Sequence, residues 1–303
     1  MRVVIAGGSG FLGQALTRQL AKGGHQVVLL TRGPDAAGAG GPVRRAAWTP
    51  DGRTGPWAAD IDGADAVVNL AGASIADRRW SPARKQVLHD SRADSTRSLA
   101  AAIRAVHIKP GVFIQGSAVG FYGAYDTDET FDESSGPGAD FLATLAVAWE
   151  AEAHPIATLT RLVFVRTGIV LAKHGGALAK MATPFKFFVG GPIGGGRQMM
   201  SWVHLDDWVS LVIWAITTPA VDGPINAAAP HPVTNDEFSR ALGRALHRPS
   251  WMPAPGFALK LAFGEMATDM LLRGQRVVPR RALELGYRFR FERIDEAMAA
   301  AVR

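Results

Sequence analysis

Three glycines near the N-terminus have the spacing of a loop that binds phosphate groups. Gly7, Gly10 and Gly13 follow a short apolar segment and open a stretch with helical spacing. In such a loop the first glycine permits a tight turn, the second lets backbone N–H groups approach a pyrophosphate, and the third permits close packing of the helix. The pattern predicts a dinucleotide-binding site.

The residues that end the second predicted strand indicate which dinucleotide binds. An NAD site usually has an acidic residue there, which accepts hydrogen bonds from the ribose 2′-hydroxyl. This chain has Thr31 and Arg32 instead, and a guanidinium can pair with a 2′-phosphate through two charge-assisted hydrogen bonds. We therefore expect NADP(H) in preference to NAD(H). The alternative is that Arg32 is a solvated loop residue.

The elements that must position these residues alternate along the chain. Apolar runs predict strands over residues 2–6, 26–31, 43–48, 64–70, 111–115, 162–166 and 224–228, and helical spacing predicts helices over 11–22, 82–106, 140–152, 206–217, 235–246 and 256–272. This alternation is typical of the α/β class, with a Rossmann-type doubly wound parallel sheet. We expect a dinucleotide-binding domain over 1–167, to which the strand near 224–228 returns, and a smaller substrate lobe with a C-terminal helical region over 168–303.

Composition excludes several classes of protein. The 303 residues are 48% hydrophobic, enough for a full core, and include no cysteine, which excludes disulfides and cysteine-ligated zinc. No export signal is recognisable and no apolar run is long enough to span a bilayer, so we expect a cytoplasmic protein. The net charge is +6, but the arginines are scattered. A solvated basic surface, or recognition of an anionic small molecule, is therefore expected rather than binding of nucleic acid.

Further motifs carry a family resemblance. They are Asn-Leu-Ala-Gly at 69–72, Gly-Ser-Ala-Val-Gly-Phe-Tyr-Gly at 116–123 and Ser-Trp-Val-His-Leu-Asp-Asp at 201–207. With the glycine loop, they make nearly the whole chain resemble the short-chain dehydrogenase/reductase superfamily. More narrowly, the chain is similar to its atypical, NAD-dependent epimerase/dehydratase-like branch with a C-terminal domain of unknown function. The resemblance implies that the 69–72 turn lies against the cofactor and that Ser117 contacts the reacting carbonyl or hydroxyl.

The same resemblance exposes a missing catalytic pair. The family's tyrosine and lysine should lie at the start of the helix after Asp140, and Leu142 and Ala146 occupy those positions if Glu150 is the glutamate that follows one turn later. None of the three tyrosines in the chain has a lysine four residues beyond it. In the family mechanism the lysine lowers the pKa of the tyrosine, which contributes about 10² to 10⁴ in rate. Redox chemistry is therefore expected to be slow or of another kind, unless another group substitutes.

Other residues are candidates to complete a site. Tyr122 shares a loop with Ser117 and could donate a proton, or could be a packed aromatic residue with its hydroxyl satisfied. Arg197 and Trp202 are candidates for substrate binding, with a surface loop as the alternative for Arg197. The stretch around residues 204–207 has side chains that bind metals, but a strand followed by a capped helix explains it better, so no metal site is expected.

The sequence is compatible with two functions. The first is an NADP(H)-dependent oxidoreductase or epimerase-like enzyme, acting on a carbonyl, hydroxyl or sugar-nucleotide substrate with Ser117 and Tyr122 as catalytic residues. The second is a protein that binds NADP(H) as a sensor or structural ligand without catalysis. The resemblance also suggests a homodimer through the helices after strands four and five. The predicted cofactor-binding residues are Gly7, Ser9, Gly10, Phe11, Leu12, Gly13, Thr31, Arg32, Leu70, Ala71, Gly72, Arg79 and Gly168.

Overall fold

Seven parallel strands form the central sheet of the computed structural model, which describes residues 1–33, 41–125 and 129–303. Their order across the sheet is β11-β7-β5-β4-β1-β2-β3, so the chain starts in the middle and winds outward in both directions. The strands are β1 (Arg2–Ala6), β2 (Gln26–Thr31), β3 (Val43–Ala47), β4 (Ala66–Asn69), β5 (Val112–Ala118), β7 (Arg161–Thr167) and β11 (Gly223–Ala227). The predicted doubly wound α/β fold is confirmed.

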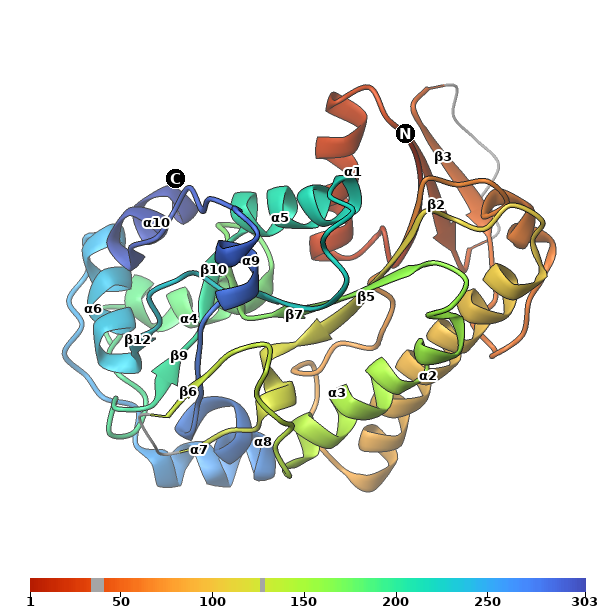
Figure 1. The fold of residues 1–303 in the computed structure, drawn as a ribbon. Helices are drawn as coiled ribbons and strands as arrows, with labels where there is room; N and C mark the ends of the chain where they lie inside the picture. Colours follow the sequence, from red (N-terminus) through yellow and green to blue (C-terminus); the bar gives the residue numbers. More distant parts are fainter. Residues whose placement is uncertain (34–40, 126–128) are drawn as a thin grey trace.

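Helices cover both faces of this sheet (Figure 1). Helices α1 (Phe11–Lys22) and α5 (Leu205–Thr217) lie on one face, and α2 (Pro82–Ala105) and α3 (Phe141–Ala151) lie on the other. Successive residues of a strand point to opposite faces. In β1, accordingly, Val3 packs in the core that includes Leu16 of α1, and Val4 packs in the core that includes Leu99 of α2.

Beside the sheet and its covering helices lies a smaller, helical lobe. It has its own core, formed around Trp202, Phe238 and Met298. Its helices are α4 (Gly176–Lys186), α6 (Asn235–Leu246), α7 (Gly256–Phe263), α8 (Glu265–Ala267) and α10 (Ile294–Ala301), whereas α9 (Arg280–Glu284) packs against the core of the central sheet through Ala282. Six short strands in the described ranges pair in twos outside the central sheet. They are β6 (Thr130–Phe131), β8 (Ile169–Leu171), β9 (Met199–Met200), β10 (Trp202–His204), β12 (Val233–Thr234) and β13 (Arg276–Val277).

One predicted helix differs from the structure. The sequence predicts a single helix over 256–272, but Gly264 has a φ of +63° and a ψ of −138°, a conformation that is essentially restricted to glycine. The chain therefore turns there, and α8 and a π-helical turn at Thr268–Leu272 follow. The break redirects the segment 269–275 toward the ends of β5 and β7, where it forms one wall of a cavity.

The C-terminal segment returns to the sheet-bearing part of the chain. Strand β13 pairs with β6 in parallel. The backbone N–H of Val277 donates to Ser201 Oγ at 2.9 Å, and Asn226 Nδ2 donates to the carbonyl oxygen of Val278 at 3.0 Å. The lobe expected over 168–303 is therefore bound to residues of the first domain along its own tail.

No helix in the described ranges combines the length and the apolar character that crossing a membrane requires.

Candidate functional site

The glycine loop connects β1 to α1 and leaves the start of this helix uncapped. Gly7 has a φ of +81°, and a Cβ there would lie 2.6 Å from the carbonyl carbon of Leu70. A Cβ on Gly13 would lie 2.3 Å from the carbonyl oxygen of Gly7. The N-cap residue, Gly10, has no side chain, so the first-turn N–H groups point outward without a side-chain acceptor. This arrangement fits a pyrophosphate at the positive end of a helix.

The 69–72 turn lies against the loop, where the family resemblance places it. Asn69 is buried at the end of β4, and its Nδ2 donates to Thr96 Oγ1 at 3.0 Å and to Gln115 Oε1 at 3.1 Å. Its Oδ1 accepts a hydrogen bond from the backbone N–H of Ala71 at 3.1 Å. These bonds fix the shape of the turn, and its backbone closes one side of the loop next to Leu70.

A pocket of about 650 Å³ adjoins the loop at the end of β2. Ser9, Thr31 and Arg32 line it, as the sequence predicts, together with Arg18 and Arg45, which sequence reasoning missed. Arg18 is on α1, and Arg45 is on β3, opposite Leu29 of the parallel neighbour β2. The two arginines are far apart in the sequence, so only the fold brings them together. Three guanidinium groups around one pocket give it a strongly positive potential.

A second cavity, of about 400 Å³, lies between the glycine loop, the ends of β5 and β7, and the segment 269–275. Phe11 and Leu12 line it from the loop, and Gly168 lines it directly after β7. A Cβ on Gly168 would lie 2.6 Å from the carbonyl oxygen of Ser201, so a glycine is required for the chain just before β10 to approach the end of β7 this closely. Ligands of open α/β sheets bind at the carboxyl ends of the strands, which is where this cavity lies.

Leu142 and Ala146, which occupy the positions of the absent tyrosine and lysine, both line this cavity from α3. From β5 the lining residue is Ala118, whereas Ser117 is buried and its Oγ donates to Glu150 Oε1 at 2.6 Å. Ser117, predicted to contact a substrate, therefore does not line this cavity, because adjacent residues of a strand point to opposite sides. The two expected positions of the family's tyrosine and lysine, and Ala118 beside them, therefore present apolar side chains to the cavity.

The environment of Tyr122 contradicts its predicted role as a proton donor. The side chain is fully buried, donates to Asn226 Oδ1 at 2.8 Å and accepts from Arg166 Nη1 at 3.0 Å. Burial raises the pKa of the Tyr122 hydroxyl to about 12. The residue is a packed aromatic with a satisfied hydroxyl, and it does not line the cavity.

Behind the cavity wall, Glu150 and Arg166 form a buried ion pair. Their side chains are 7% and 6% exposed, and two hydrogen bonds of 2.9 Å join the guanidinium to the carboxylate. The Arg166 Cζ also lies 3.4 Å from the centre of the Phe121 ring. Together with Ser117 and Tyr122, this pair forms a polar network that connects α3 to β5 and β7.

Three further predicted residues lie away from the cavity. Trp202 is fully buried in the core of the C-terminal lobe, and its Nε1 donates to the carbonyl oxygen of His231 at 3.2 Å. Its predicted contact with substrate is wrong, because the side chain packs into that core. Arg197 is exposed on a loop and does not line the cavity. Arg79 is also exposed, and it lies next to Gly264 rather than at the glycine loop.

Three charged residues that line the cavity were missed at the level of sequence, and one of them, Arg273, directly follows the π-helical turn. Arg92 lines the cavity from α2 and Asp269 lines it from the π-helical turn. Burial, and then the charges of Asp140 and Glu265, raise the pKa of the Asp269 carboxyl. Arg92 could have been noticed, because it falls on the same helical face as the buried Leu88. No sequence signal indicated Asp269, since its position depends on the break in the predicted helix.

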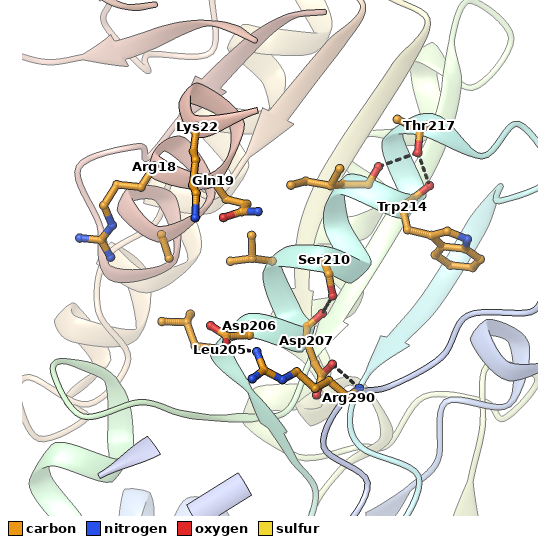
Figure 2. Close-up of a pocket in the computed structure, with 13 residues that line it drawn as sticks. Arg18, Gln19, Lys22, Leu205, Asp206, Asp207, Ser210, Trp214, Thr217 and Arg290 are labelled. Carbon is orange, nitrogen blue, oxygen red and sulfur yellow. Dashed lines mark hydrogen bonds and ion pairs between the residues drawn. The ribbon is translucent and has the colours of Figure 1, made fainter. Parts of the chain in front are cut away.

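Another groove lies away from the site. It has a volume of about 800 Å³ and lies between α1 and α5, where Lys22, Asp206 and Arg290 surround it (Figure 2). Arg290 Nη1 pairs with Asp206 Oδ2 at 3.4 Å. Its lining residues include none of the predicted site residues, and the groove lies beside the sheet rather than at the carboxyl ends of the strands. We therefore assign the site to the cavity and the arginine-lined pocket.

The strand order and the glycine loop define a Rossmann-type dinucleotide-binding fold. The chain belongs to the NAD dependent epimerase/dehydratase family, whose model matches residues 3–228. A domain of unknown function, DUF1731, matches residues 254–301. The predicted resemblance to the epimerase-like branch with such a C-terminal domain is confirmed.

Individual relatives match the whole of this chain. The chain is 39% identical to the epimerase family protein SDR39U1 of Bos taurus, with 100% of both chains covered. It is also 39% identical to the chloroplastic SDR39U1 homolog of Arabidopsis thaliana, over 100% of this chain and 87% of that one. The crystal structure of human epimerase family protein SDR39U1 with NADPH superposes with a TM-score of 0.90 at 36% identity, covering 100% of this chain and 99% of the human one.

Proposed function

We propose that this protein binds NADP(H) and acts on a small, anionic molecule in the adjoining cavity, as an oxidoreductase-like member of its family. The observation that carries the cofactor assignment is the pocket of Arg18, Arg32 and Arg45 at the end of β2. A 2′-phosphate distinguishes NADP from NAD, and arginine side chains pair well with phosphate. The presence of NADPH in the human relative supports the same assignment.

Different residues bind the cofactor and transfer the proton. The N–H groups at the start of α1 bind the pyrophosphate, and Phe11, Leu12 and Gly168 border the part of the cavity next to it. The bound cofactor supplies or accepts a hydride. Asp269 is the single carboxylate among the described lining residues, and burial keeps its proton on to a higher pH than in an ordinary aspartic acid. We assign Asp269 the proton transfer that the absent tyrosine performs in other members.

The cofactor assignment is tested by comparing the binding of NADPH and NADH to the wild type and to Arg32→Ala. Loss of a charged hydrogen bond costs about 1.5 to 3 kcal/mol, so NADPH binding is expected to weaken by about 10- to 100-fold while NADH binding stays the same. Arg44→Ala is the matched control, because this neighbouring arginine pairs with Asp60 outside the pocket. An unchanged preference for NADPH in Arg32→Ala would contradict the assignment.

The second candidate function is a protein that binds NADP(H) without catalysis, and the apolar residues Ala118, Leu142 and Ala146 favour it. The two candidates are distinguished by incubating the protein with NADPH and a panel of carbonyl compounds and sugar nucleotides while following cofactor absorbance. Turnover that Asp269→Asn abolishes supports the enzyme. Tight NADPH binding without turnover across the panel supports the sensor.

The cytoplasm stays the proposed compartment, and fractionation of the source cells tests it, because the Arabidopsis relative is described as chloroplastic. A homodimer through α2 and α3 is likewise a proposal of the family resemblance.

A further inference from the structure

Arg92 lines the cavity, and one edge of its guanidinium group makes no hydrogen bond to the described residues. Its Nη1 donates to the carbonyl oxygens of Ala73 at 3.2 Å and Leu88 at 3.0 Å. Nε and Nη2 of Arg92 have no hydrogen-bond acceptor among the described residues. Both atoms are accessible to solvent. The two N–H groups on this edge are parallel, as in the forked arrangement that arginine uses to bind carboxylates.

The charge of Arg92 also lacks a counter-ion. In the described ranges no carboxylate pairs with it, and burial followed by the nearby charge of Arg84 lowers the pKa of Arg92 to about 10. The group therefore remains protonated at neutral pH. A partly buried cation next to a second cation is unfavourable unless an anion joins it.

Trp149 and Gly72 pack against this guanidinium, and its charged neighbours are Arg84 and, in the cavity lining, Asp269 and Arg273. The Arg92 Cζ lies 4.9 Å from the centre of the Trp149 ring on α3. On the other side, a Cβ on Gly72 would lie 3.3 Å from Arg92 Cγ, so the glycine gives the side chain its space. Leu142 and Ala146 continue the cavity wall from the same helix as Trp149.

We infer that the cavity binds a carboxylate on an otherwise apolar molecule, with the carboxylate on the Nε–Nη2 edge of Arg92. This inference rests on the proposed function, in which the cavity holds the substrate beside the cofactor. Two parallel N–H···O bonds match the spacing of carboxylate oxygens. The apolar lining residues, among them Leu142, Ala146 and Met200, match the apolar part of such a molecule.

Benzoate and benzamide are a matched pair of probes, because they have nearly the same shape and differ in charge. Each is titrated by calorimetry into the wild type, Arg92→Gln, Arg92→Lys and Arg104→Gln, with and without saturating NADPH. We expect wild type to bind benzoate at least about tenfold more tightly than benzamide, which corresponds to about 1.4 kcal/mol. Arg92→Gln should lose this preference, and Arg92→Lys should keep part of it. Arg104 is exposed on the same helix and outside the cavity, so Arg104→Gln should behave as wild type.

Three results would overturn the inference. They are the absence of benzoate binding to wild type, equal affinities for the two probes, and an unchanged preference in Arg92→Gln. If Arg92→Gln weakens NADPH binding as much as benzoate binding, the guanidinium serves the cofactor and the inference is also wrong. Melting temperatures identify a misfolded Arg92→Gln, in which case the comparison with Arg92→Lys decides. Titration of NADPH alone tests the proposed function separately, because the benzoate titration is also made without cofactor.

Discussion

At the scale of single residues, the cavity has apolar side chains at the expected positions of the family's tyrosine and lysine. Its charged side chains lie at other positions in the wall. Ala118, Leu142 and Ala146 can neither give nor take a proton. Arg92 and Asp269 lie in the same cavity but come from other elements. Arg92 is on α2, and Asp269 is on the π-helical turn. In the proposed enzyme, the proton is therefore transferred by a residue on the π-helical turn instead of a tyrosine on α3.

The pH dependence of turnover tests this relocation. Burial raises the pKa of Asp269, so the acid is protonated below that raised value and loses its proton as the pH increases through it. If Asp269 donates a proton in the reduction direction, kcat is expected to be highest at low pH and to decrease as the pH rises. Asp269→Asn should reduce kcat by about 10²-fold or more, the usual contribution of a general acid, and should remove this pH dependence.

Asp269→Glu, which keeps the carboxyl group, should retain a pH-dependent rate. NADPH binding should be the same in all three proteins, since Asp269 is assigned no contact with the cofactor. A pH profile in Asp269→Asn identical to that of wild type would exclude the assignment.

At the scale of elements, most of the sheet and its first helices could be predicted from sequence. The bounds of β1, α1 and β2 agree with the predicted ranges, because glycines mark their ends clearly. The direction of Ser117 could not be predicted, because a parallel strand buried on both faces has no alternation of polar and apolar residues. The presence of Arg18 and Arg45 in one pocket could not be predicted from sequence either, because it depends on pairing between β2 and β3.

The buried pair of Glu150 and Arg166 fixes α3 to the sheet, and its removal is expected to destabilise the fold. Glu150→Ala leaves Arg166 buried without a partner, which costs about 3 to 5 kcal/mol in the free energy of unfolding. Glu152→Ala on the same helix is the control, because its pair with Arg97 is more exposed, and about 0 to 1 kcal/mol is expected. Urea unfolding at neutral pH measures both values. Equal losses in the two variants would show that the buried pair has no special role.

At the scale of the whole molecule, the proposed homodimer has candidate contact residues on the outer faces of α2 and α3. Val87 and Val147 are 48% and 37% exposed on these helices. If the helices form the interface, the combined change Val87→Glu and Val147→Glu should convert a dimer to a monomer, because it places charge in an apolar contact. Light scattering should then report a molar mass near 32.2 kDa. Leu283→Glu, an exposed leucine on α9, is the control, and a wild type that is monomeric at every concentration tested would contradict the proposal.

The return of the C-terminal tail to the first domain has a consequence for how relatives could be recombined. The two family matches, at 3–228 and 254–301, follow one another in sequence and look exchangeable. Strand β13, however, lies between β6 and the residues around Ser201, and the cavity wall at 269–275 precedes it directly. A chimaera that takes the second region from a relative must therefore take the matching β6 as well. The substrate wall and the segment around residue 130 are thus constrained to change together.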